Sequence, residues 1–265
     1  LLHQLRERGF AVTAIDTSIG GAAHDVLQGG LGQRLARLVA ARVYAAVFIA
    51  TPCKSYSVRR RPKLRSRAQP DGIQPVPPEW QRYLDKHNAL AEVTAQVMAA
   101  AHAAAVPFAL ENPADRGDPD SPAYWPRYAD HGSLWRLLEW KARSSPGLLA
   151  ALAACSFYTF AMCAFQSPHQ KYTTVAATGA LAAALAPLGT TAFGCSHGLS
   201  RHAQQLTGRD SFGRSLTEEA AAYPRPFNVF AADAIAAVVA AGGPFAPPGP
   251  FASPASDAPQ IGTAH

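Results

Sequence analysis

Short apolar runs alternate with helix-like repeats along the chain. The run 10–15 is rich in aromatic and β-branched residues and ends at Asp16, which predicts a buried parallel strand. Runs at 44–50 and 108–110 predict two further strands of the same kind. A fourth run, 157–165, is aromatic-rich and also predicts a strand.

Apolar residues at helical spacing separate these runs. The longest stripe lies within 84–105, where Leu84, Ala91, Val97 and Met98 share one face and Pro107 ends the helix. The same spacing predicts helices over five other segments, namely 1–8, 31–43, 134–142, 175–189 and 228–241.

Strands that alternate with helices in this way predict an α/β protein with a Rossmann-like, doubly wound and mostly parallel sheet. A length of 265 residues fits one such domain, which we place at 1–241. Residues 242–265 are rich in Pro, Gly, Ala and Ser and predict a disordered tail.

The net charge of +6 is concentrated in one segment. Six of the nine residues in 59–67 are basic and none is acidic, and without these six the basic and acidic residues are equal at 18 each. A local basic patch indicates a polyanionic partner, because a uniformly basic chain would spread its charge. Since the patch lies among prolines in 54–80, we expect it to form a long mobile loop. No apolar run is long enough for a spanning helix, so no membrane partner is expected.

Four cysteines are few for this length, which argues against a disulfide scaffold and favours a reducing, intracellular compartment. The first residue, Leu1, already lies in a helical pattern, so we expect a further segment to precede it.

Cys53 is the first candidate for chemistry. It follows the strand predicted at 44–50, and Pro52 restricts the backbone immediately before it. Lys54 and the arginines of 59–61 are cations that we expect to lower the pKa of the thiol and so activate a nucleophile. The alternative is a buried structural cysteine, the commoner fate of this residue type.

Carboxylates end the other two strands. Glu111 could protonate or hold a ring nitrogen of a substrate, or could simply cap the next turn. Asp16 could bind ribose hydroxyls, and Asp25 could face an adenine amino group, although both are also ordinary turn residues. Because ligands bind beyond the carboxyl ends of parallel strands, Asp16, Cys53 and Glu111 should converge on one edge of the sheet.

These residues resemble the DNA cytosine-5 methyltransferases. Pro52-Cys53-Lys-Ser-Tyr-Ser57 is similar to the Pro-Cys nucleophile motif of that family, and Glu111-Asn112-Pro113 to its Glu-Asn-Val motif. The segment from Cys163 to Lys171-Tyr-Thr173 resembles a segment of phage and mobile-element members, and Cys195 with the nearby His197 and His202 fits the pattern that follows it there. Arg214-Ser-Leu-Thr-Glu-Glu and Tyr223-Pro224 resemble the segment before the last helix of the family.

The resemblance implies a function. The Cys53 thiolate would add to C6 of a flipped-out cytosine, Glu111 would hold N3 and the exocyclic amine, and C5 would take a methyl group from S-adenosylmethionine. Asp16, Asp25 and Pro52 would contact this cofactor. DNA, the expected partner of a monomeric enzyme, would be bound by the residues Ser57, Arg59, Arg60, Arg61, Lys63, Arg65, Lys171 and Thr173.

The chain departs from the family pattern in three ways. A Gly-rich cofactor loop is absent from the sequence, Lys171 and Thr173 would have to replace a Gln-x-Arg-x-Arg stretch, and 175–215 leaves room only for a small target-recognition insertion. These departures keep open a catalytically inactive, nucleic-acid-binding protein. A third reading is an unrelated hydrolase or redox protein that uses Cys53 with His24 as its base.

A metal site is a further alternative. Cys163, His169, Cys195, His197 and His202 have the residue types of a zinc site, but their spacing matches no familiar finger. We therefore predict no metal, with Cys163 on a strand and the histidines exposed or near nucleic acid.

Overall fold

The computed structural model describes residues 1–197, 202 and 222–242. The predicted tail, the Arg214 motif and most of the second half of the proposed insertion at 175–215 lie outside these residues. The strands are β1 (Val47–Ala50), β2 (Phe108–Pro113), β3 (Ser156–Ala161) and β4 (Tyr172–Ala177). The helices are α1 (Leu2–Glu7), α2 (Thr17–Gly20), α3 (Leu31–Ala40), α4 (Pro78–Ala103), α5 (Leu134–Ala142), α6 (Pro146–Ala153), α7 (Gly179–Leu185) and α9 (Arg225–Ala241).

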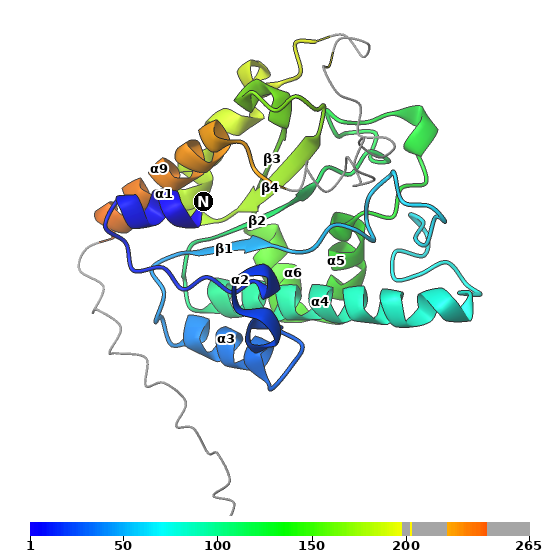
Figure 1. Ribbon diagram of the computed structural model, residues 1–265, viewed down its shortest axis with the longest axis horizontal. Coiled ribbons are helices and arrows are strands. Elements are labelled where there is room, and N and C mark those ends of the chain that lie inside the picture. The colour runs from blue at the N-terminus through cyan, green and yellow to red at the C-terminus, as the bar shows by residue number, and fades with distance from the viewer. Residues whose placement is uncertain (198–201, 203–221, 243–265) are drawn as a thin grey trace, which may run out of the picture.

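The sheet is small and mixed, with strand order β1-β2-β4-β3 (Figure 1). Only β1 and β2 pair in parallel, while β4 runs antiparallel to both β2 and β3. The prediction of a Rossmann-like, mostly parallel sheet was therefore wrong. The connection 162–171 between β3 and β4 is too short for the crossover that a parallel pair requires, so the two strands form an antiparallel hairpin.

Three sequence runs were assigned wrongly or given wrong bounds in that prediction. Residues 10–15 form no strand, although Phe10 and Val12 still pack against the core. The expected helix at 175–189 begins only at Gly179, because 175–177 complete β4. The predicted strand 157–165 ends at Ala161 and is followed by the 3-10 turn η3 (Met162–Phe165).

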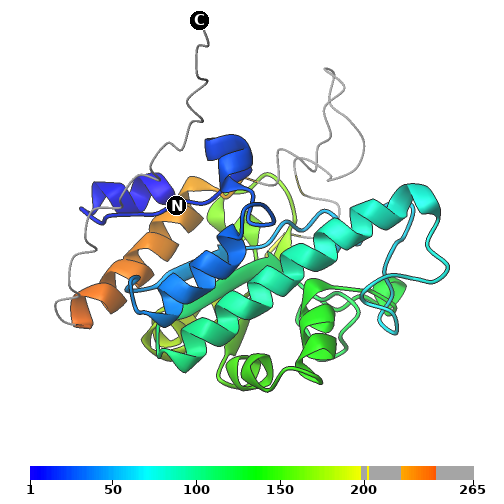
Figure 2. The same cartoon turned by 90° about the horizontal axis from the view of Figure 1, so that it is seen from below.

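Helices cover both faces of the sheet. Phe108 and Leu110 of β2 pack on the face that is covered by α3, α4, α5 and α6. Ala109 packs on the opposite face, which is covered by α7 and α9. Figures 1 and 2 show these two helical layers on opposite sides of the strands. The alternation of side chains along β2 therefore places Glu111 on the α9 side and Asn112 on the α4 side.

The segment 54–77, here called the cationic loop, is packed against α4. Tyr56 is 1% exposed, and its hydroxyl donates a hydrogen bond of 3.0 Å to the backbone oxygen of His87. The Arg65 guanidinium is stacked on the Tyr56 ring at 4.4 Å and donates to Asn88 Oδ1 at 2.8 Å. Aromatic and guanidinium groups of this part of the segment thus fill the space above α4, and the mobility expected of the loop stays a prediction.

We predict that His87 makes the stability of the protein sensitive to acid. Burial, with a further contribution from the Arg65 charge, lowers the pKa of the imidazole from 6.5 to about 4. Between these two pH values the unfolded chain binds a proton that the folded chain does not, so the free energy of unfolding falls as the pH is lowered. The loss attributable to His87 is on the order of 3 kcal/mol between pH 6.5 and pH 4.

Urea denaturation at pH 7 and pH 4.5 measures this loss. His87→Gln should reduce the difference between the two unfolding free energies, whereas His102→Gln, a control on the same helix, should leave it unchanged. An unaltered difference in the His87 variant would contradict the assignment.

Candidate functional site

The turn that carries Cys53 is fixed by two side chains from neighbouring elements. The Asn112 amide on β2 donates a hydrogen bond of 2.7 Å to the backbone oxygen of Thr51. The Thr51 hydroxyl shares a hydrogen bond of 2.6 Å with the Thr94 hydroxyl on α4. Since β1 and β2 are parallel, their carboxyl ends meet, and Cys53 and Glu111 lie at the same edge of the sheet.

Glu111 lies at the centre of a buried group of polar residues. It is 4% exposed, and its Oε2 accepts a hydrogen bond of 2.5 Å from the Tyr223 hydroxyl. The Lys171 Nζ lies 3.9 Å from its Oε1 and 5.7 Å from the centre of the Tyr223 ring. The antiparallel pairing of β2 and β4 brings Lys171, just before β4, to the carboxylate, whereas Tyr223 reaches it from the segment just before α9.

Two buried oxygen atoms in this group lack a hydrogen-bond partner among the described residues, namely Glu111 Oε1 and Thr173 Oγ1. Pro113 pairs with Thr173, so Glu111 and Thr173 lie diagonally on one face of the sheet. A buried polar atom without a partner is costly. Its occurrence twice on one face, beside Cys53 and Lys171, points to a polar ligand.

Burial dominates the chemistry of the Cys53 thiol. It raises the pKa of Cys53 above the ordinary value of 9.0, and the Lys171 charge, the strongest opposing influence, only partly offsets it. The Glu111 charge raises the pKa further, and Lys54 lowers it only weakly. Lys54 thus acts in the expected direction, but the larger opposing charge comes from Lys171 and not from the arginines of 59–61.

Burial also raises the pKa of Glu111, against the influence of Lys171 and of the Tyr223 hydrogen bond. The pKa of Tyr223 is raised well above 10.0 by burial and by the Glu111 charge. Tyr223 therefore keeps its proton and donates a hydrogen bond to Glu111, and burial makes the Glu111 carboxyl easier to protonate than an exposed one. A protonated Glu111 that accepts at Oε2 would carry its proton on Oε1, which lies 3.9 Å from Lys171 Nζ and has no hydrogen-bond partner among the described residues.

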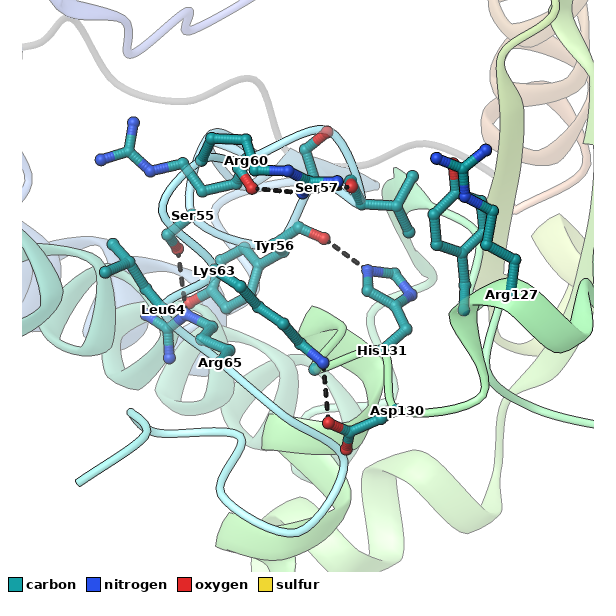
Figure 3. Close-up of a pocket in the computed structure, with 14 residues that line it drawn as sticks. Ser55, Tyr56, Ser57, Arg60, Lys63, Leu64, Arg65, Arg127, Asp130 and His131 are labelled. Carbon is teal, nitrogen blue, oxygen red and sulfur yellow. Dashed lines mark hydrogen bonds and ion pairs between the residues drawn. The ribbon is translucent and has the colours of Figure 1, made fainter. Parts of the chain in front are cut away.

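A pocket of about 230 Å³ lies within the cationic loop and faces η2 (Pro126–Tyr128) (Figure 3). Its lining includes five cationic side chains, which are Arg60, Arg61, Lys63, Arg65 and Arg127. One acidic residue, Asp130, also lines it and pairs with Lys63 at 2.7 Å. The concentration of positive charge makes this pocket suited to an anion such as a phosphate.

The predicted nucleic-acid contacts of the cationic loop differ in their surroundings. Arg59 and Arg61 are exposed, so their side chains can reach a phosphate. Arg60 lies over the rings of Trp80 and Tyr83 at 4.3 and 4.7 Å, and its Nε and one terminal nitrogen are buried without a hydrogen-bond partner among the described residues.

Ser57 and Arg65 serve the loop itself. The Ser57 hydroxyl accepts from the Arg59 backbone N–H at 3.2 Å. Arg65 is 3% exposed, and its guanidinium donates to Ser55 Oγ at 3.2 Å in addition to its bonds described above (Figure 3). These contacts give Arg65 a structural role at the base of the pocket.

The predicted cofactor residues do not come together around a described cavity. Asp16 caps α2 by accepting from the Ser18 N–H at 2.7 Å, and Asp25 accepts from the Leu27 N–H at 3.1 Å. Pro52 is exposed. The Nδ1 of His24 lies 3.4 Å from the Asp16 backbone N–H, so His24 belongs to that turn and has no described contact with Cys53.

Four residues considered for a metal do meet in space. Ligand atoms of Cys163, Cys195, His197 and His202 all lie within 4.8 Å of one another. His169 is not part of this group and is buried, with its Nδ1 lacking a partner among the described residues. Cys163 had been predicted to lie on a strand, but it lies in η3.

Tyr223 belongs to the site, although no role was predicted for it from the sequence. It lies just before α9 and more than a hundred residues after Glu111. Tyr223-Pro224 was noticeable as part of the family resemblance, but nothing local in those two residues indicates a contact with β2.

No family model, curated protein or solved structure matches the chain. No helix in the described parts of the chain combines the length and apolar character needed to span a bilayer.

We predict that Lys171 and Glu111 shift the pKa of Cys53 in opposite directions. Lys171→Met should raise this pKa and slow alkylation of Cys53 at pH 8, because an opposing positive charge is lost. Glu111→Gln should lower the pKa and speed alkylation. Iodoacetamide labelling across pH 7–10, with the Cys53 peptide quantified by mass spectrometry, measures both effects.

Lys54→Met is the matched control, because Lys54 is a neighbouring cation with a weaker influence on the thiol. Its alkylation profile should shift less than that of Lys171→Met. A larger shift for the Lys54 variant would show that Lys171 is not the main charge acting on Cys53.

Proposed function

We propose that this chain acts on cytosine in DNA by covalent addition of Cys53 to C6, in the manner of the DNA cytosine-5 methyltransferases that its motifs resemble. The observation that carries the proposal is the meeting of Cys53, Glu111, Lys171 and Thr173 at one edge of the sheet. A nucleophile beside a buried carboxyl is the arrangement that addition to a pyrimidine requires.

The proposed addition uses the directions in which burial and charge shift the pKa values of Cys53 and Glu111. The thiol releases its proton to solvent as the substrate approaches, and Lys171 stabilises the resulting thiolate. The sulfur forms a bond to C6, the C5–C6 π electrons shift into the ring, and the Glu111 carboxyl gives its proton to N3. The product is a neutral adduct with an electron-rich C5, and Glu111 is left as a carboxylate near Lys171.

Thr173 and Tyr223 support the same step in different ways. The Thr173 hydroxyl has a buried oxygen without a partner among the described residues and faces the side of the sheet that Glu111 faces, so it can bind a polar group of the base. Tyr223 holds Glu111 through Oε2 and leaves Oε1 to the substrate.

The cationic loop supports DNA as the partner. It begins directly after Cys53, and the pocket within it gathers cationic side chains from two segments of the chain. Cations next to the nucleophile can bind the phosphates that flank a base after the base leaves the duplex. Trp80 and Tyr83 lie against the guanidinium of Arg60, so these faces of their rings are not available for stacking on bases.

The methyl donor expected from the resemblance is S-adenosylmethionine, and the residues present do not fit it well. The carboxylates of Asp16 and Asp25 are used by backbone N–H groups of their own turns, and neither lines the described pocket. We therefore derive no step through this donor and rest the proposal on the addition to C6.

This poor fit favours one alternative function, a nucleic-acid-binding protein without catalysis. That protein would use the cationic loop in the same way, but Cys53 would not add to the base. The two functions differ in a reaction that needs no methyl donor.

We predict that the chain exchanges the C5 hydrogen of cytosine with solvent. Addition at C6 makes C5 basic, so tritium should be released from DNA that contains [5-³H]cytosine without S-adenosylmethionine. Cys53→Ala should reduce this release by at least about 100-fold, the effect expected when a covalent nucleophile is removed.

The matched control is Cys155→Ser, which removes a cysteine at the end of α6, away from this edge of the sheet. It should keep the wild-type rate of release. If the wild-type chain binds DNA but releases no tritium, the non-catalytic alternative is the better description.

We further predict that Arg59 and Arg61 contribute to DNA affinity through phosphate contacts. Arg59→Gln and Arg61→Gln should each weaken binding of a short duplex and lower the salt dependence of log K by about 0.9, which corresponds to one phosphate contact. Fluorescence anisotropy between 50 and 200 mM salt provides the measurement. Arg34→Gln on α3, also exposed but remote from the loop, should change neither quantity.

A further inference from the structure

A second cluster of reactive side chains lies near the edge that carries Glu111 and Lys171. Cys163 comes from η3, directly after β3, while Cys195 and His197 follow η5 (Thr191–Phe193). His202 comes next in the described chain. All four ligand atoms lie within 4.8 Å of one another, although Cys163 and Cys195 are far apart in the sequence.

The spacing of these atoms suits a tetrahedral ion. A tetrahedral zinc site with Zn–S of about 2.3 Å and Zn–N of about 2.0 Å holds its ligand atoms roughly 3.3–3.8 Å apart. Cys195 Sγ lies 3.3 Å from His202 Nε2, which agrees with that separation. The ring centres of His197 and His202 lie 5.0 Å apart, a separation that two imidazoles bound to one ion can have.

The surroundings supply what the ligands of a metal need. The Gln170 amide donates a hydrogen bond of 3.4 Å to Cys195 Sγ, and such bonds stabilise and orient a thiolate ligand. Cys163 is buried and Cys195 is half-buried, so the sulfur atoms lie inside while His197 lies at the surface. An ion at this point would be shielded on its sulfur side and would have an entry path on its histidine side.

We propose that Cys163, Cys195, His197 and His202 bind one Zn²⁺ ion as a structural Cys₂His₂ site. Two thiolates and two imidazoles favour zinc over the harder cations, and four protein ligands leave no open position for catalysis. This proposal is independent of the proposed function, because it rests on a different set of residues.

The site would join η3 to the segment that begins at Cys195. Lys171 lies between these two parts in the sequence, and its backbone oxygen accepts a hydrogen bond of 2.9 Å from the Met162 N–H. A zinc ion at this cluster would therefore hold the start of β4 in place. The structural consequence is a fixed position for the backbone that carries Lys171.

The test measures the metal itself. The full chain, purified without chelator and then dialysed against zinc-free buffer, should retain about one zinc per chain in elemental analysis. Cys195→Ala and His202→Ala should lower the zinc content below roughly a tenth of the wild-type value, as expected when a ligand of a four-ligand site is lost. Cys155→Ser and His169→Gln remove the same residue types outside the cluster and should retain the ion.

Cobalt replacement tests the site in the wild-type chain, so its result does not depend on whether a variant folds. The wild-type chain, stripped and loaded with Co²⁺ alone, should show the intense visible bands of a tetrahedral cobalt ion and a near-ultraviolet band from thiolate ligands. Weak octahedral bands would overturn the proposal.

Two other results would also overturn it. A chain that retains no zinc and binds none on addition of zinc chloride has no such site. A disulfide between Cys163 and Cys195 in the chain as purified, detected by mass spectrometry of unreduced peptides, would explain the closeness of the two sulfur atoms without a metal.

Discussion

The parallel pairing of β1 with β2 is the constraint on which the candidate site depends. Cys53 and Glu111 come from strands separated by the cationic loop and the whole of α4, and only parallel strands bring their carboxyl ends together. The Asn112 side chain reinforces this arrangement, since its buried hydrogen bond to Thr51 links the end of one strand to the end of the other. Such a bond contributes on the order of 1 kcal/mol, but its loss would leave a buried carbonyl without a partner at the turn that leads to the thiol.

Burial and charge both act on the pKa values at this edge. For Cys53, Glu111 and Tyr223, burial is the larger influence and raises the pKa. Removal from water favours the neutral form of the thiol, of the carboxyl and of the phenol. Lys171 is the cation that acts on both Cys53 and Glu111, so a negative charge on either of them is stabilised by the same residue. Burial thus makes ionisation of these groups harder, and a ligand that supplied dipoles to this low-dielectric surrounding would make it easier.

The pattern of apolar residues was sufficient to predict the elements in which that pattern is unbroken. The apolar runs before Cys53 and Glu111 and the long stripe of α4 predicted β1, β2 and the helix between them. The same reasoning failed where the pattern is ambiguous. Residues 172–177 combine two threonines and a valine with alanines that continue into α7, and only pairing with β2 and β3 settles that they form a strand. The activating cation could not be found from neighbours in sequence either, because charge acts through space and Lys171 reaches Cys53 across the sheet. Tyr223 and the cysteine–histidine cluster depend in the same way on contacts between distant segments.

The hairpin of β3 and β4 connects the two sets of reactive residues. It presents Lys171 and Thr173 to Glu111 at the start of β4, and it presents Cys163 at the end of β3, one residue beyond the Met162 N–H that bonds to Lys171. A lysine on a flexible segment would lose much of its effect on Cys53, because solvent would screen its charge. A rigid hairpin end keeps that charge near the sulfur. The β3–β4 connection thus positions one of the charges that act on the thiol following β1, and any ion that ties the connection to Cys195 would act on the chemistry of Cys53 without touching it.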